Sequence, residues 1–484
     1  MDFAAAHSPC RFLFRARFLI GACLIVSLVL MAGCSRVSKG YRGAQDAPVP
    51  QSAPSTPVQE APLPIPSEYD RTRGEDASLR ETTTAIASLN RQPGVERRVQ
   101  ALPADAKRRR IGLLLPLTGR NAALGKAMLR AAQLALFDLA GPNFALLPFD
   151  TKGTPDGALE AALAAFESDV SILLGPLLST SVSRISDEAR ARNIRVVAFS
   201  TDRNVAGRGV YIMGFLPRTQ VERVVAFAHS RGLSRFAVLA PQDAYGHTVV
   251  EEMKQAAAKT GGTVTRVAFY DKASATNTEK LSEIVRDLAD YDLRKQAMDD
   301  FRAELEALGD EASQLELEGL EGQETLGDVE FDAILLPAGG DPLKSIAPLL
   351  SYYDIDPKKV RFLGTGQWDD PTIGTEPALV GGWYATSEPK EWERFVRRYK
   401  ERFEKKPPRL ASLAYDATAL AAVLVGTGTS LDDFSLTVRG GFAGVDGVFR
   451  FHADGLVERG LAVLQVGRRG PRVVSPAPAK FTGG

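Results

Sequence analysis

From Ile111 onward, short apolar runs alternate with amphipathic stretches, and this alternation limits the possible folds more than any other feature of the chain. Residues 111–115 contain no polar side chain. The stretch after them repeats apolar residues at helical spacing, namely Leu124, Met128, Ala131, Ala135 and Leu139. Strands that are apolar on both faces need helices on both faces, as in a parallel α/β sheet. The sequence therefore predicts an α/β fold.

The alternation occurs twice along the chain, which predicts two sheets. After residues 111–115, the first series of strands is expected at 144–149, 171–174, 194–199 and 210–215. After Pro217, the second series is expected at 235–240, 263–270, 332–336 and 360–364. A strand at 382–386 and helices at 391–404 and 410–425 are expected to return to the first unit. Residues 447–451 and 461–466 are expected to form a terminal hairpin around the Asp454-Gly455 turn signal.

The N-terminal residues have the pattern of an export signal. Three arginines precede an apolar run at 18–31, which is shorter than the roughly 20 residues that a membrane-spanning helix needs. The run ends in Ala32-Gly33-Cys34, which resembles the bacterial lipobox, so residues 1–33 are expected to be a signal peptide and Cys34 a lipidation site. The alternative is an ordinary secretory signal. Ser35 is not the aspartate that resembles an inner-membrane retention signal, which favours the outer membrane.

Two further segments differ from the α/β pattern. Residues 34–107 are rich in Pro, Ala, Ser, Thr and Gln, which predicts a disordered tether with a span of about 50 Å. Residues 286–329 interrupt the second series of strands with a stretch of high helix propensity, and within residues 287–325 acids outnumber bases about four to one. We expect this stretch to be a protruding helical arm, either a solvated surface excursion or a docking surface.

Composition and motifs argue against an enzyme, a metal site and nucleic-acid binding. Lys+Arg and Asp+Glu both total 59, so the chain lacks the net positive charge that draws proteins onto nucleic acid. All three cysteines lie at or before Cys34, and the three histidines after the signal are far apart in sequence. Two matches to penicillin-binding motifs, at 259–261 and 387–390, stand in reversed order and lack the Ser-Asp-Asn element. No cofactor or metal is therefore expected.

Polar residues follow several expected strands, and ligands of open α/β sheets bind beyond the carboxyl ends of strands. Ser179 and Thr180 open a helix whose free N–H groups are suited to a carboxylate, and Ser200 and Thr201 follow the next strand. The simpler alternative is that Ser179 only caps its helix.

The other half of an amino-acid site is expected from the second unit. An α-ammonium would require an acid, for which Asp243 or Asp369 is suitably placed, and Tyr245 and Trp368 would form apolar walls.

Several segments carry a family resemblance, namely IGLLLPLTGRNAALGKAMLRAAQLALFD, ILLGPLLSTSV, VVAFSTD, DAYGHTVVEEMK and GVDGVFRFHADG. In this order they resemble the type I periplasmic binding proteins of the branched-chain amino-acid class over nearly all of residues 110–474. The resemblance implies two parallel-sheet sandwich lobes joined by three crossovers. Lobe 1 would then be 108–217 and 381–440, and lobe 2 would be 218–380 and 441–474.

Two phrases, AFSTDRNVAGRGVYIMGF and GFAGVDGVFRFHADGLVERGLAVLQV, look more like the LpoA-type lipoprotein activators of penicillin-binding proteins. Better-known members of that family carry a helical repeat domain before this module, where this chain has its Pro-rich segment. The resemblance implies a periplasmic, outer-membrane lipoprotein that regulates a peptidoglycan synthase. The alternative is a substrate-binding lipoprotein that delivers a branched-chain or other amino acid to the permease of an ABC transporter.

Overall fold

The computed structural model describes residues 108–271 and 273–481. The expected signal peptide, the lipidation site at Cys34 and the Pro-rich segment up to residue 107 lie outside the described residues. Within the described part of the chain, no helix is both long and apolar enough to cross a membrane.

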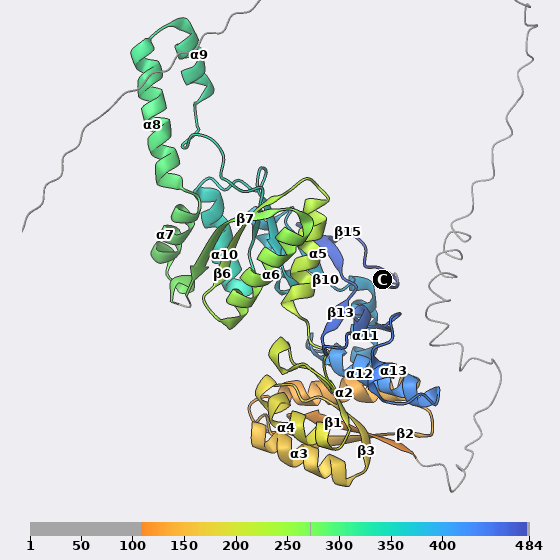
Figure 1. The fold of residues 1–484 in the computed structure, drawn as a ribbon. Helices are drawn as coiled ribbons and strands as arrows, with labels where there is room; N and C mark the ends of the chain where they lie inside the picture. The colour runs from red at the N-terminus through yellow and green to blue at the C-terminus, as the bar shows by residue number, and fades with distance from the viewer. Residues whose placement is uncertain (1–107, 272, 482–484) are drawn as a thin grey trace, which may run out of the picture. The chain divides into compact units, whose positions relative to one another are not determined.

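The first lobe is built on a five-stranded parallel sheet with the strand order β2-β1-β3-β4-β5 (Figure 1). Its elements are β1 (Arg109–Leu115), α2 (Ala122–Leu139), β2 (Phe144–Asp150), α3 (Pro155–Glu167), β3 (Val170–Leu174), α4 (Ser179–Ala191), β4 (Arg195–Ala198), η1 (Arg203–Val205) and β5 (Val210–Ile212). The last five residues of β1 are buried, as expected for a central strand that is covered on both faces.

The second lobe contains a seven-stranded sheet with the order β15-β14-β10-β9-β8-β6-β7. Strands β6 to β10 run parallel to their neighbours, whereas β14 is antiparallel to β10 and β15 is antiparallel to β14. Its strands are β6 (Arg235–Pro241), β7 (Thr263–Tyr270), β8 (Ala333–Leu335), β9 (Arg361–Gly364), β10 (Trp383–Thr386), β14 (Ala462–Gln465) and β15 (Arg472–Ser475). Its helices are α5 (Pro217–His229), α6 (Ala244–Thr260), η2 (Ser274–Thr276), α7 (Thr278–Leu288), α10 (Gly340–Tyr352), η3 (Gly366–Trp368), η4 (Ile373–Thr375) and η5 (Pro377–Leu379).

The elements between β10 and β14 complete the first lobe. They are α11 (Pro389–Phe403), α12 (Ala411–Gly426), α13 (Asp433–Leu436), and a small antiparallel sheet of β11 (Phe442–Gly444), β12 (Gly447–Phe451) and β13 (Val457–Arg459). Helix α12 packs along α2, and its apolar residues share a core with β1 and β3. The chain thus passes between the lobes three times: between β5 and α5, between β10 and α11, and between β13 and β14. The expected two-lobed α/β fold with three crossovers is confirmed.

Two predicted boundaries of the lobes are wrong. Strand β10 pairs with β9 and β14 in the second sheet, so the chain returns to the first lobe only after Thr386 and not at residue 381. The terminal hairpin is formed by β12 and β13, and the strand predicted at 461–466 instead pairs with β10. Phe449 and Phe451 lie in the core of the first lobe, which also removes β12 from the predicted extent of lobe 2.

The acidic stretch forms two helices, α8 (Tyr291–Leu308) and α9 (Glu311–Gly319), which we call the arm. Figure 1 shows α8 and α9 extending beyond the body of the second lobe. The arm begins later than the predicted residue 286, because Leu288 and Ala289 at the end of α7 are buried in the lobe's core. At its base, the Arg294 carbonyl accepts a hydrogen bond from the Leu326 N–H (3.0 Å), which holds the two ends of the arm side by side.

Candidate functional site

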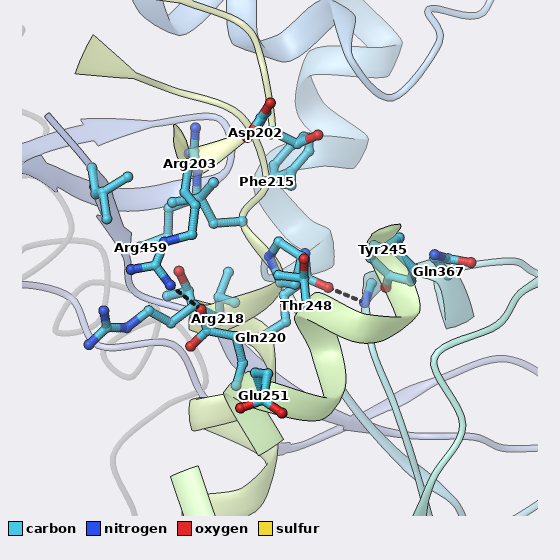
Figure 2. A pocket seen from close by; sticks show the side chains of 18 of the residues that line it. Asp202, Arg203, Phe215, Arg218, Gln220, Tyr245, Thr248, Glu251, Gln367 and Arg459 are labelled. Carbon is cyan, nitrogen blue, oxygen red and sulfur yellow. Dashed lines mark hydrogen bonds and ion pairs between the residues drawn. The ribbon is translucent and has the colours of Figure 1, made fainter. Parts of the chain in front are cut away.

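A cavity of about 830 Å³ lies between the two lobes, next to the three crossovers. Figure 2 shows Asp202, Arg203 and Phe215 from the first lobe and the first crossover around the same space as Tyr245 and Thr248 from α6. Thr386 at the end of β10 and Ser387 line the cavity at the second crossover, and Leu456, Arg459 of β13 and Leu461 line it at or just before the third. The volume is in the range of small-molecule sites, which typically measure about 300–1,000 Å³. The fold therefore places a ligand-sized space where the two lobes meet.

Arg459 is a buried cation in the wall of this cavity. Its side chain extends from β13, and the residue is 5% exposed. Its Nη2 donates a hydrogen bond to the Met213 carbonyl (2.7 Å), while the guanidinium lies 5.1 Å from the ring centre of Phe215 and 5.4 Å from that of Phe449. Within the described residues, its Nε and Nη1 have no hydrogen-bond partner. Two donors of a buried guanidinium are thus unsatisfied, and neither is open to solvent.

Arg409, which lies two residues before α12, is a second arginine in the cavity wall, and unlike Arg459 it has an ion-pair partner. It forms an ion pair with the fully buried carboxylate of Asp446 (2.5 Å) and lies 4.0 Å from Asp369 of the second lobe. Its guanidinium is 4.8 Å from the ring centre of Phe215, on which Arg459 also lies. Arg409 therefore links the first lobe to the loop after β9, next to the cavity.

A pair of buried carboxyl groups lies behind these arginines. Burial raises the pKa of Asp416 to about 7, and the neighbouring charge of Asp446 acts in the same direction. The Asp416 Oδ1 accepts a hydrogen bond from the Val445 N–H (2.8 Å), and the Asp446 Oδ2 accepts one from the Ser412 hydroxyl (2.7 Å). Burial therefore favours the protonated form of Asp416, whereas the nearby charge of Arg459 favours the carboxylate.

An ion pair joins the lobes across the cavity. Arg203 of η1 forms an ion pair with Glu252 of α6 at 2.6 Å, and Glu252 is 3% exposed. Within the second lobe, on the same side of the cavity as the first crossover, the Gly366 N–H donates a hydrogen bond to the Gln220 Oε1 (2.7 Å). A nearly buried carboxylate needs a partner, so the Arg203–Glu252 pair favours the arrangement in which the lobes meet.

Of the residues predicted to bind a ligand, Thr201 and Tyr245 line the cavity. The Tyr245 hydroxyl lies 3.1 Å from the Thr365 hydroxyl. The other predicted residues are not part of the lining, namely Ser179, Thr180, Ser200, Asp243, Trp368 and Asp369.

These other residues have local structural contacts. Trp368 was predicted as a cavity wall, but its indole is completely buried in the second lobe and donates to the Leu336 carbonyl (3.0 Å). Asp243 caps α6 by accepting the Gly246 N–H (2.8 Å). The Ser200 hydroxyl accepts the Asp202 N–H (3.1 Å). Ser179 is the first residue of α4, whose N-cap is Leu178, so the alternative of Ser179 as a capping residue is wrong as well.

Sequence reasoning missed Arg203, Glu252, Arg409 and Arg459. In the structure, Arg459 shares a face of β13 with the buried Val457, but a strand of three residues is too short for this alternation to be recognised in the sequence. Within the described residues, no group of three or more His, Cys, Asp or Glu side chains could hold a metal ion.

Several proteins of known structure share this fold. A provisionally assigned branched-chain amino acid ABC transporter protein from Rhodospirillum rubrum has a TM-score of 0.59 and 19% identity, over 76% of this chain and 100% of its own. A substrate-binding protein of an ABC transporter from Sphaerobacter thermophilus has a TM-score of 0.55 and 17% identity, over 78% of this chain and 98% of its own. LpoA from Haemophilus influenzae has a TM-score of 0.54 and 14% identity, over 76% of this chain and 59% of its own.

Among curated proteins, an uncharacterized protein of Rickettsia prowazekii is 24% identical over 189 residues, which make up 38% of this chain. The match spans about half (48%) of that relative's length. The family described as periplasmic binding protein matches residues 109–471, which include both lobes, the arm and the three crossovers. This chain therefore belongs to the periplasmic binding protein family.

Proposed function

We propose that this chain is a non-catalytic lipoprotein of the cell envelope that regulates a peptidoglycan synthase of the penicillin-binding protein class by direct contact. Similarity in fold to LpoA and to transporter binding proteins is compatible with a regulator and with a receptor. The observation that favours the regulator is the arm, because a receptor for a small ligand needs only the two lobes.

The arm presents a strongly acidic surface. Helices α8 and α9 carry eight acidic and three basic residues. All three bases are engaged within the second lobe: Arg294 with Asp354 and the Gly327 carbonyl, Lys295 with Asp299, and Arg302 with carbonyls near the end of the arm. The acids on the outer surface therefore dominate the field that a partner meets.

Exposed leucines stand among these acids. Leu293, Leu308 and Leu315 are each more than 60% exposed, although leucine is among the residues most often buried. Single exposed apolar side chains also occur on solvated surfaces, so the leucines support a protein contact only in combination with the acidic field around them. The partner that fits is a basic protein surface with apolar contacts.

The test measures glycan synthesis by the host's purified penicillin-binding proteins with and without the full chain in detergent. We expect stimulation that falls in the double variant Glu304→Gln/Glu306→Gln and with added salt, because both changes weaken an acidic contact. The matched control is Glu279→Gln/Glu283→Gln on α7, outside the arm. Equal stimulation by both double variants, or no stimulation by the wild type, contradicts the proposal.

Anchoring belongs to the same proposal. Lipidation at Cys34, with residues 34–107 as a tether of about 50 Å, would let an outer-membrane protein reach a synthase at the inner membrane. Mass spectrometry of the mature N-terminus and fractionation of Cys34→Ser test this anchor, and a mature form without lipid contradicts it.

The interlobe cavity favours a second candidate, a receptor that carries a small molecule to the permease of an ABC transporter. A thermal-shift response to amino acids together with unchanged synthase activity would favour the receptor over the regulator.

A further inference from the structure

Helix α8 of the arm carries an outward stripe of acids and leucines. Residues of α8 that lie three or four positions apart share one face of the helix, and all of those on the outward face are exposed, namely Leu293, Ala297, Asp300, Glu304 and Leu308. The opposite face carries the buried Met298 and Leu305. Asp300 accepts a hydrogen bond from the Gln296 side chain (2.8 Å), and within the described residues neither Asp300 nor Glu304 forms an ion pair.

Helix α11 carries an outward stripe that is mainly basic. Its members are all exposed and follow one another at intervals of four, three and four residues, namely Lys390, Arg394, Arg397 and Glu401. The opposite face of the helix is buried through Phe395 and Tyr399, whose hydroxyl donates to the Ala127 carbonyl of α2 (3.2 Å). Arg394 pairs with Glu391 of its own helix (2.8 Å), and in the part of the chain that the structure describes Arg397 forms no ion pair.

The two stripes are both uncovered in one molecule. Helix α8 packs on α7 and α9, whereas α11 packs on α2 in the first lobe. Figure 1 shows the arm extending from the second lobe beyond α7. The acidic stripe of one copy is therefore open to the basic stripe of another.

The charges fit one relative direction of α8 and α11. If the two helices ran parallel at the matching intervals, Asp300 would face Arg397, but Glu304 would face Glu401. If they run antiparallel, Asp300 lies opposite Arg397 and Glu304 opposite Arg394, while Glu401 faces an alanine. Since like charges at facing positions of paired helices are unfavourable, the antiparallel arrangement is preferred.

We propose that this chain self-associates through its arm, with α8 of one copy docked antiparallel on the outward face of α11 in a second copy. In this arrangement the exposed Leu308 lies on the aliphatic stem of Lys390. This inference goes beyond the regulation of a synthase and stands without it. Because both contacts use the acids of the arm, a second copy and a synthase would compete for the same surface.

The test is sedimentation velocity of the full chain in a nonionic detergent, over a range of protein concentrations and at low and moderate salt. We expect the mass to rise with protein concentration, and less so in moderate salt, because salt screens exposed charges. The double variants Asp300→Arg/Glu304→Arg and Arg394→Glu/Arg397→Glu should each associate roughly tenfold more weakly, because each replaces two attractions with two repulsions.

An equimolar mixture of the two double variants separates this contact from a general effect of charge. Each variant alone opposes like charges at the contact. In the mixture, the basic arm of one variant meets the acidic α11 of the other, so association should return. The matched control is Arg468→Glu/Arg469→Glu, which changes the same amount of charge at exposed arginines after β14 and should associate like the wild type. Circular dichroism checks that each variant is folded.

The proposal is overturned if the wild type stays monomeric, if the mixture of variants does not associate, or if the control variant at residues 468 and 469 loses association. Arg394→Glu/Arg397→Glu leaves the arm unchanged, so this variant should still stimulate a synthase. Self-association and stimulation are measured separately, and failure of one is distinguishable from failure of the other.

Discussion

Because Gly364 has no side chain, the Trp368 indole can pack against the end of β9 and hold the loop that follows this strand. A Cβ at Gly364 would lie 2.1 Å from the Trp368 indole, which fills that space and is completely buried. Gly364→Ala should therefore displace the indole and lower the free energy of unfolding by about 1–3 kcal/mol, as overpacking does. Gly366→Ala is the control, because the nearest atom there is the Gln220 side chain at 3.3 Å, and urea denaturation compares the two. Equal stability of both variants contradicts the expectation.

The raised pKa of Asp416 predicts how the free energy of unfolding changes with pH. Its folded-state pKa is raised to about 7 by burial, from 3.8. Between about pH 4 and 7, the folded state keeps a proton that the unfolded state has lost, so this group makes the protein less stable as pH rises, by at most about 1.4 kcal/mol per pH unit. Asp416→Asn removes this dependence. Its stability relative to the wild type should increase from pH 4 to 7 and level off above; parallel pH profiles in urea denaturation would contradict this.

For the predicted site residues, the sequence indicated which loops they lie in but not where their side chains point. Strand ends and loops were located well enough to bring Thr201 and Tyr245 to the cavity. The direction of a side chain within a loop was not predictable, because Trp368 turns into the core and Asp243 onto its own helix. The arginines were missed because a surface arginine and a buried one look alike in a single sequence, and only partners distant in sequence, such as Asp446 for Arg409, distinguish them.

At the scale of elements, the alternation of apolar runs and amphipathic stretches predicted which segments form strands but not which of the two sheets each strand joins. Strand β10 follows η5 in the second lobe and precedes α11, so its sequence position fits either lobe. Its membership is decided by pairing with β9 and β14, and the latter comes nearly 80 residues later. The hairpin was misplaced for a related reason: β13 has only three residues, too few for a clear period-two pattern.

The arm should be dispensable for folding. Arg294 and Leu326 lie side by side at its base, and loop closure costs only about 0.6 kcal/mol per doubling of length. Replacing residues 297–322 with a short Gly-Ser linker keeps Arg294, its ion pair with Asp354, and the buried end of α7. We expect a cooperative thermal transition within a few degrees of the wild type. An unfolded variant would show that Met298 and Leu305, which are buried in the arm, also support the lobe.

At the scale of the whole molecule, side chains at the crossovers join the two lobes. Arg409 lies near Asp369, and Arg203 pairs with Glu252. Arg223 of α5 holds the end of the third crossover on the second lobe by donating to the Leu461 carbonyl (2.8 Å). A change at the cavity therefore acts on the same residues that hold the lobes together.

The Arg203–Glu252 pair provides the most direct test of this coupling. Arg203→Ala would leave a carboxylate that is 3% exposed without its cation, so we expect a loss of about 1–3 kcal/mol of unfolding free energy. In a Glu252→Gln background the same substitution should cost much less, because the buried charge is already removed, which gives a coupling energy of about 1 kcal/mol or more.

Arg208→Ala, at an exposed arginine of the same loop, is the matched control. Urea denaturation measures all five proteins, and small-angle scattering should show a larger radius of gyration for Arg203→Ala if the pair holds the lobes together. Additive effects of the two substitutions, with unchanged scattering, would mean that the pair contributes nothing across the cavity and that the crossovers alone fix the lobes.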